Sequence, residues 1–253
     1  MSAASPLSPQ PQADATILPS SEACRILAAM GHDLRTPLNS ILGFTGTLLM
    51  QLPGPLNADQ EKHLKTVQAS GRQLLQVINA LVDLAKLESG ALRNHPEPIV
   101  CAELAEQALA AVRPRAELRG LAIAVEDRLG PGGRLHGDPR IVARILAQLA
   151  ENAVQFTERG GVRLVLEAAS DPAGGRRAIE FQMHDTGPGL SDDLQARLFE
   201  APVHPKGRRP GEGAGLGLYL SHRLAQLIGA RLRFESRPGK GSVFALALPE
   251  PGA

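Results

Sequence analysis

The chain has 253 residues, a formal net charge of +1 at pH 7 and only 3% aromatic residues. Domains that bind nucleic acids are usually strongly basic and stack bases on aromatic side chains, so this composition argues against a nucleic-acid partner. The two cysteines, Cys24 and Cys101, show no metal-ligand spacing, and no apolar run reaches the roughly 18 residues of a membrane span. We therefore expect a cytoplasmic protein with no zinc site, disulfide framework or membrane span in this chain.

Residues 1–21 are rich in Ser, Pro, Gln and Ala, which predicts a disordered leader. Residues 22–92 then show helical periodicity twice, interrupted by the sequence LPGPLN at 52–57. Two such helices bury their apolar seams fully only by pairing with a second hairpin, so we expect a homodimer with a four-helix core. The seam positions are Leu34, Leu38, Ile41, Thr45 and Leu48 in the first helix, and Leu64, Val67, Gly71, Leu74, Ile78, Leu81 and Ala85 in the second.

A histidine stands beside the first seam. His32 precedes Leu34 by two residues, or about 200° around the helix, so its side chain should point away from the seam. Pro37 cannot donate to the carbonyl of Asp33 and should bend the helix close to His32. Taken alone, these features also fit an ordinary surface histidine and an accidental proline.

The pattern changes over residues 96–250, where strand and helix signals alternate. Helices separated from a run of mostly hairpin-connected strands indicate an α+β two-layer sandwich, with one sheet and one helical layer. The expected helices cover about 102–118, 138–157 and 215–229, and the expected strands cover 121–126, 162–169, 177–185, 231–236 and 242–248.

Two glycine-rich segments follow in this half, DTGPGL at 185–190 and GEGAGLGLYLS at 211–221. The second lacks a preceding strand, so it does not fit a dinucleotide-binding fingerprint, and the chain contains no P-loop sequence. Glycines that open a helix do favour a polyphosphate, because bare N–H groups and the helix dipole attract negative charge.

Four motifs in order make the pattern specific: HDLRTPLN at 32–39, QLAENAVQFT at 148–157, DTGPGL at 185–190 and GAGLGLYLS at 213–221. Over about residues 22–249 the chain resembles the catalytic core of a sensor histidine kinase. That core consists of a dimerisation and phosphoacceptor hairpin followed by the ATP-binding fold shared with gyrase and Hsp90. LFEAP at 198–202 matches the family's phenylalanine box more loosely.

The resemblance implies a role for each matching position. His32 would attack the γ-phosphorus of ATP with the help of Asp33, Asn152 would ligate Mg²⁺, and residues 191–212 would form a mobile lid. Asp185 would accept a hydrogen bond from the adenine amine. The other implied nucleotide-binding residues are Gln155, Gly187, Gly189, Gly213, Gly215, Gly217 and Leu218.

The implied function is an ATP-dependent protein-histidine kinase of two-component signalling. It would pass the phosphoryl group to an aspartate of a response regulator, and Thr36, three residues after Asp33, would serve a regulator phosphatase activity. The input would come from a separate sensor protein or from a sensor domain absent from this chain.

Two alternatives have different consequences. A gyrase-like or Hsp90-like hydrolase would need a glutamate where the chain has Gln148, and Glu151 lies about 100° around the helix from Asn152. A weakly active phosphotransfer scaffold is the second alternative. It arises because the family usually has asparagine at the position of Gln148 and lysine at the position of Gln155.

Overall fold

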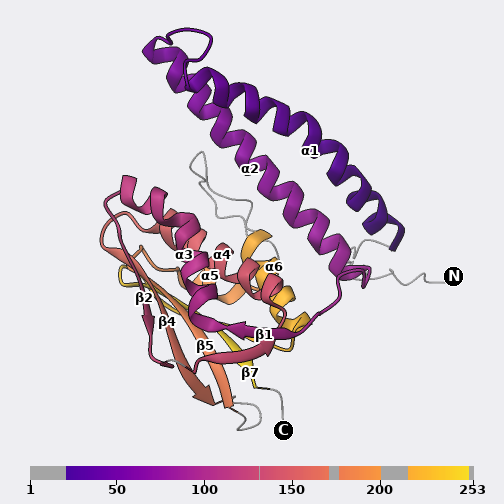
Figure 1. The fold of residues 1–253 in the computed structure, drawn as a ribbon, viewed down its shortest axis with the longest axis vertical. Coiled ribbons are helices and arrows are strands. Elements are labelled where there is room, and N and C mark those ends of the chain that lie inside the picture. Colours follow the sequence, from indigo (N-terminus) through magenta and orange to yellow (C-terminus); the bar gives the residue numbers. More distant parts are fainter. Residues whose placement is uncertain (1–20, 131, 171–176, 201–215, 251–253) are drawn as a thin grey trace, which may run out of the picture.

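Two long helices form the N-terminal part of the structure. The computed structural model describes residues 21–130, 132–170, 177–200 and 216–250, with side chains from residue 30 onward. Helix α1 (Ser21–Leu49) and helix α2 (Ala58–Glu88) pack against each other as a hairpin (Figure 1). The break expected at 52–57 is confirmed. A capping box begins α2, in which the Asn57 side chain accepts from the Gln60 amide at 2.8 Å and the Gln60 side chain accepts from the Asn57 amide at 3.0 Å.

The predicted apolar seam divides between two surfaces. Leu38 and Ile78 are buried between the helices together with Val82. The close approach depends on Gly71, where an added Cβ would lie 2.8 Å from a methyl group of Leu42. Five of the predicted apolar positions face outward on the single chain, and these are Leu34, Ile41, Leu48, Val67 and Leu74, whereas Ala85 is buried. Helix α1 continues through Pro37 without interruption.

A five-stranded mixed sheet forms the second half, in the order β2 (Ala122–Asp127), β4 (Gly161–Ser170), β5 (Arg177–Asp185), β7 (Gly241–Pro249) and β6 (Arg231–Arg237). The β2–β4 pair is parallel, and the other pairs are antiparallel. A second sheet pairs β1 (Glu97–Val100) with β3 (Arg134–Gly137), a strand that sequence patterning did not predict.

Helices cover one face of the large sheet (Figure 1). They are α3 (Cys101–Leu118), α4 (Pro139–Phe156), the short α5 (Asp192–Arg197) and α6 (Leu216–Leu227). The expected α+β two-layer sandwich is therefore confirmed. Within the range 191–212, where a mobile lid is expected, α5 forms and Leu198, directly after it, is buried in the core. The rest of that range, from residue 201, lies outside the described residues.

A buried carboxylate fixes the start of α4. The side chain of Asp138 is fully buried and accepts from the backbone amide of Arg140 at 3.1 Å and from that of His95 at 2.9 Å. Burial alone would raise the pKa of Asp138, but these hydrogen bonds and the Arg140 guanidinium lower the pKa to about 2. Asp138 thus ties the segment that leaves the hairpin to the helix that carries the nucleotide motif.

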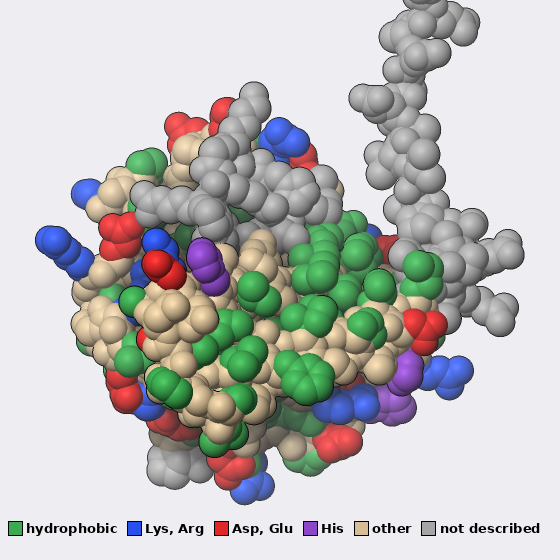
Figure 2. Space-filling model, turned by 90° about the horizontal axis from the view of Figure 1, so that it is seen from above, with side chains coloured by type: hydrophobic (Ala, Val, Ile, Leu, Met, Phe, Trp, Pro, Cys, Tyr) green, Lys and Arg blue, Asp and Glu red, His purple; other side chains and the backbone are tan. Residues whose placement is uncertain are grey.

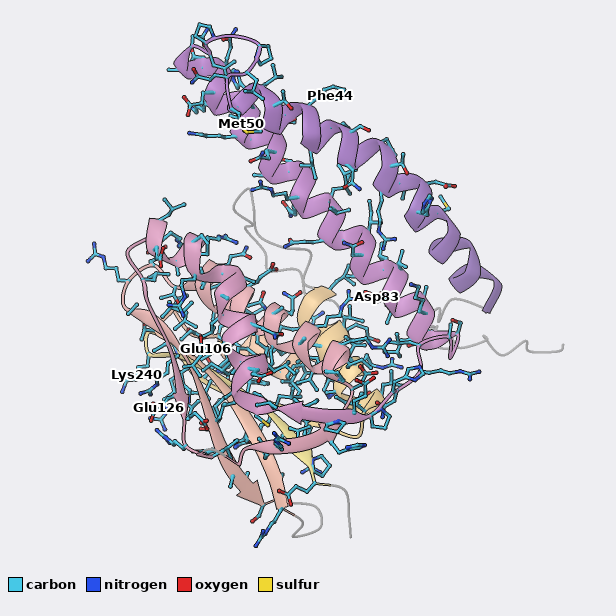
Figure 3. All side chains as sticks on the ribbon, viewed as in Figure 1. Phe44, Met50, Asp83, Glu106, Glu126 and Lys240 are labelled. Atoms are coloured by element: carbon cyan, nitrogen blue, oxygen red, sulfur yellow. The ribbon has the colours of Figure 1, made fainter. Side chains whose placement is uncertain are left out.

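The C-terminal half of α2 packs against the second domain. Ala80 is only 9% exposed and belongs to the same core cluster as the sheet and its helices, with Leu84 and Leu87 packed beside it. Polar contacts join the two parts around this apolar stripe. They include the Asp83–Arg144 ion pair, the Glu88–Arg223 ion pair at 2.8 Å, and a hydrogen bond of 3.0 Å from Gln76 to Glu151. Figure 3 shows Asp83 on the side of α2 that faces this domain.

We expect Asp138→Ala to lower the free energy of unfolding by about 2 kcal/mol at pH 7, because five N–H donors lose a buried acceptor. The folded-state pKa is depressed, so the stabilisation is complete above about pH 4 and is lost as the pH falls through about 2. Urea unfolding followed by circular dichroism should show the difference between variant and wild type shrinking over that range. A difference that stays constant from pH 7 to pH 2 would contradict this role of the carboxylate.

Candidate nucleotide and phosphoacceptor site

The middle of α4 carries the first part of the candidate site. Gln148 donates from Nε2 to Oδ1 of Asn152 at 3.1 Å, so the two amides are held together on one helix face. Gly217, at the start of α6, packs directly on Gln148, and an added Cβ there would overlap the Gln148 amide. The N-terminus of α6, with its positive dipole end, therefore lies against the helix face that bears Asn152.

The C-terminal end of α4 carries the second part. Asp185, the residue expected to bind adenine, is the last residue of β5. Its Oδ1 accepts a hydrogen bond from the Gly187 amide at 2.8 Å. An added Cβ on Gly187 would lie 3.2 Å from the carbonyl oxygen of Phe156, the last residue of α4. Phe156 remains 44% exposed beside this pair. Sequence reasoning missed Phe156, although an apolar ring on a polar helix end next to the motif was the available signal.

Burial raises the pKa of Asp185, and the backbone N–H groups of Gly187 and Ser242 oppose the rise. A carboxylate in such surroundings is a strong hydrogen-bond acceptor, because little water competes for it. The arrangement suits recognition of an exocyclic amine.

The loop after β5 depends on a glycine in the left-handed region. Gly189 has φ +69°, and an added Cβ would overlap the carbonyl oxygen of Arg237. The neighbouring hydrogen bond from the Gly239 amide to the Pro188 carbonyl, at 2.7 Å, holds the two loops together. Thr186 donates its hydroxyl to the Arg159 carbonyl at 2.8 Å and fixes the other side of the loop.

These two parts lie along one helix. Eight residues separate Gln148 from Phe156, which corresponds to about 12 Å of helix, the scale of an extended nucleotide. Aromatic and amine-accepting groups gather at the Phe156 end, whereas amides and a helix N-terminus gather at the Gln148 end. The site is thus suited to a base at one end and phosphates at the other.

The phosphate-suited end opens on a cleft of about 370 Å³ between the two halves of the structure. The second domain contributes Gln148, Glu151 and Gly217 to its lining, among others. The hairpin contributes residues from both helices, namely Arg35, Gln76, Asn79, Ala80 and Asp83. Arg35 is held there by a hydrogen bond of 2.7 Å from Nε to Oδ1 of Asn79.

His32 projects into solvent, as predicted. Its side chain is 84% exposed, and its Nδ1 lies 3.6 Å from Oδ1 of Asp33, too far for a hydrogen bond but close enough for electrostatic orientation. Thr36, one turn later, is also exposed and donates to the His32 carbonyl at 3.4 Å. The structure does not bring His32 into contact with the nucleotide residues.

Other predicted site residues divide by position. Leu218 packs against the domain core, and Gln155 is half-buried with its backbone carbonyl 3.1 Å from the guanidinium of Arg119. Gly213 and Gly215 lie outside the described residues. Among the described residues no group of three acidic, histidine or cysteine side chains could hold a metal. The Asn152 carboxamide oxygen is nevertheless a hard donor of the kind that Mg²⁺ accepts alongside phosphates and water.

Comparison with known proteins agrees with this geometry. Residues 23–90 match the family model of the His Kinase A (phospho-acceptor) domain, and residues 137–252 match that of the histidine kinase-, DNA gyrase B- and HSP90-like ATPases. The chain belongs to the sensor histidine kinases. The histidine kinase family therefore accounts for both the hairpin and the nucleotide-suited domain.

Individual relatives support the assignment. The chain is 36% identical over 228 residues to the circadian input-output histidine kinase CikA of Synechococcus elongatus, covering 88% of this chain and 29% of that protein. It is 34% identical over 230 residues to the signal transduction histidine-protein kinase BarA of Escherichia coli K12, covering 88% of this chain and 24% of that protein. The chain thus spans less than a third of these curated relatives.

Solved structures match as well. Full-length ShkA in complex with AMPPNP superposes with a TM-score of 0.69 at 32% identity, covering 90% of this chain and 46% of that one. The Acinetobacter baumannii histidine kinase AdeS shares the fold with a TM-score of 0.60 at 19% identity, covering 87% of this chain and 98% of that one. In the part of the chain that the structure describes, no helix is long and apolar enough to cross a bilayer.

We expect Gly189→Ala to weaken ATP binding at least tenfold and to destabilise the domain, because the new methyl group collides with the Arg237 backbone. Gly239→Ala is the matched control. Gly239 also has a left-handed φ, +76°, but an added Cβ meets nothing within 4 Å, so it should cost only about 1 kcal/mol of stability. Calorimetric ATP affinities and urea unfolding would measure both effects. Equal losses in the two variants would show that the close approach of the two loops does not matter.

Proposed function

We propose that the chain is an ATP-dependent protein-histidine kinase that phosphorylates His32 and passes the phosphoryl group to an aspartate of a response regulator. The observation that carries the proposal is the placement of an exposed His32 on the hairpin and a nucleotide-suited site on the second domain, whose phosphate-suited end opens toward that hairpin.

The surroundings of His32 suit it as a nucleophile. The Asp33 carboxylate lies nearest to Nδ1, so it favours the tautomer with the proton on Nδ1 and leaves the lone pair on Nε2 available. Attack by Nε2 on the γ-phosphorus forms an N–P bond, while the bond from that phosphorus to the β,γ-bridging oxygen breaks and ADP leaves with the electron pair. The Nδ1 proton then passes to Asp33 or water, which restores a neutral ring.

The second domain supplies binding and orientation. Asp185 accepts the adenine amine, Phe156 offers a ring face to the base, and the α6 N-terminus with Gly217 faces the phosphates. Asn152 would hold Mg²⁺, and the bound ion would offset the negative charge of the phosphate oxygens.

Transfer to a response regulator and its dephosphorylation use the same face of α1. Thr36 follows His32 by one helical turn and is exposed, so a docked receiver domain contacts both side chains. The Thr36 hydroxyl then positions a water against the phosphorylated regulator. A separate sensor, or a sensor domain outside this chain, supplies the input, and the protein acts in the cytoplasm.

Two observations count against hydrolysis as the main activity. Gln148 is a neutral amide already bonded to Asn152, and a glutamine is a poor general base. Glu151 accepts a hydrogen bond from Gln76 of α2, so its carboxylate is directed to the hairpin and not to a water near Asn152. Burial also raises the pKa of this carboxyl. The weakly active scaffold remains the second candidate because Gln155 supplies no positive charge near the phosphates.

We expect incubation with γ-labelled ATP to label the wild-type chain through an acid-labile, base-stable bond. His32→Gln should abolish the label and keep ATP affinity, because His32 touches no nucleotide residue. Asp185→Asn should instead weaken ATP binding by tenfold or more, because an amide that donates opposes the adenine amine. Calorimetry measures the affinities.

The wild-type result decides between the two candidates. A wild-type chain that binds ATP but stays unlabelled would support the scaffold, and a label that survives His32→Gln would disprove the assignment of His32.

We further propose that the chain is a homodimer joined through the hairpin. Met30, Leu34, Ile41, Phe44 and Leu48 recur at helical spacing on α1 and are all exposed on the single chain, with Val67 and Leu74 on α2. Figure 2 shows several patches of hydrophobic side chains on the side of the molecule seen from above, and Phe44 points away from α2 in Figure 3. A second hairpin covers these exposed apolar side chains.

Phe44→Glu should convert the dimer to a monomer, because Phe44 is 73% exposed on the single chain and lies on the proposed interface, where a charge would be buried. Ala69→Glu is the control. Ala69 is exposed on α2, about 160° around the helix from Val67, so this substitution adds the same charge away from the proposed interface. Light scattering coupled to size exclusion measures the mass. A wild-type monomer, or a dimer that survives Phe44→Glu, would refute this interface.

A further inference from the structure

The phosphate-suited end of the nucleotide site faces the hairpin of its own chain. Gln148 and Gly217 line the same cleft as Arg35, Asn79 and Asp83 of the hairpin. The hairpin and the second domain pack through a specific interface. Ala80 is buried in the core of the second domain, and the ion pairs Asp83–Arg144 and Glu88–Arg223 flank it.

The side of α1 that turns toward this cleft is the side that carries His32. Leu38 is buried against α2, and Arg35, three residues earlier, lies about 60° further around α1 and reaches the cleft through Asn79. His32 is another three residues earlier and another 60° or so in the same direction. His32 and the cleft are therefore on the same face of the hairpin.

His32 also lies at the level of the docked domain along the hairpin. Gly31 packs directly against Val82 of α2, and Val82 precedes Asp83, which pairs with Arg144 of the second domain. Little movement along the helix axis is needed for the γ-phosphate end of the site to meet His32.

The proposed dimer interface is on the opposite face. His32 precedes Ile41 of the exposed apolar stripe by nine residues, or about 180° around α1. A partner hairpin seated on that stripe holds its own nucleotide-binding domain beyond the stripe, so the four-helix core separates that domain from this His32.

From these positions we infer that each chain phosphorylates its own His32, within one subunit and not across the dimer. The inference rests on the proposed kinase function and adds to it which subunit's ATP is used. Nε2 of His32 forms its bond to the γ-phosphorus of the ATP held by the same chain, and ADP leaves into the same cleft with the electrons of the broken P–O bond.

The test uses full-length chains that carry two different affinity tags and form mixed dimers isolated by tandem purification. One partner is the wild-type chain, and the other combines His32→Gln with Asn152→Ala and Asp185→Asn, so it has neither an acceptor nor a working nucleotide site. We expect the wild-type chain of this mixed dimer to be labelled by γ-labelled ATP at the same rate per intact chain as in the wild-type dimer. No label on it would overturn the inference, because labelling across the dimer needs both partners.

A reciprocal pair gives the opposite signal. His32→Gln paired with Asn152→Ala/Asp185→Asn should carry no label, whereas label on the chain that retains His32 would overturn the inference. If the chains do not dimerise, the labelling rate per chain should be independent of protein concentration, and a rate that rises with concentration would overturn it. Absence of label on the wild-type dimer itself would count against the proposed kinase function, and so the two failures are distinguishable.

Discussion

The packing of α2 against the second domain is the contact on which the rest of the arrangement depends. Ala80 enters the domain core, and the acidic side chains of Asp83 and Glu88 pair with arginines of α4 and α6. A hairpin and a sandwich joined only by a short linker would have no defined relation, and neither the cleft nor the orientation of the site would exist. The apolar contact of Ala80, Leu84 and Leu87 removes hydrocarbon surface from water, and the two partly buried ion pairs beside it fix the orientation of the hairpin.

Helix α4 transmits this placement to the chemistry. It begins at the buried cap of Asp138, bears Arg144 and Glu151 toward the hairpin, and bears Gln148 and Asn152 toward the α6 N-terminus. Its last residue, Phe156, meets the loop of Gly187. Helix α4 thus sets the positions of the base site, the phosphate site and the surface that contacts the hairpin. A shift of the hairpin against α4 would therefore move the nucleotide-binding residues through this one helix.

Sequence patterning predicted the elements with strong periodicity and the motifs with special backbone needs. The hairpin, the break at 52–57, the five strands of the large sheet and the outward orientation of His32 followed from spacing, whereas Asp185 and Gly217 were singled out by the family resemblance. Patterning failed where signals are short or overlap. Strand β3 has four residues with two charged or polar side chains, and α5 is a single turn and a half in a glycine-rich region.

The docking stripe on α2 is a different kind of failure. The residues of α2 that contact the second domain alternate along the helix with those of the hairpin seam; they are Ala80, Leu84 and Leu87. The helix is therefore apolar on two faces, and periodicity alone does not distinguish the two faces. The seam itself was read as a single surface, although Leu38 contacts α2 and Ile41 faces outward. Which part of an apolar stripe meets which partner is decided by tertiary packing, and the sequence does not encode it locally.

The docking contact can be measured directly by zero-length carbodiimide crosslinking. In an Arg144→Lys variant the new amine lies beside the Asp83 carboxylate, and the native Glu61–Lys65 pair on α2, at 2.5 Å, serves as an internal control for reactivity. Peptide mass spectrometry of a mixture of light and heavy isotope-labelled protein should find an α2–α4 crosslink, with both peptides from the same chain. If Glu61 and Lys65 crosslink but Asp83 does not, or if the α2–α4 crosslink joins light to heavy chains, the docked arrangement described here is contradicted.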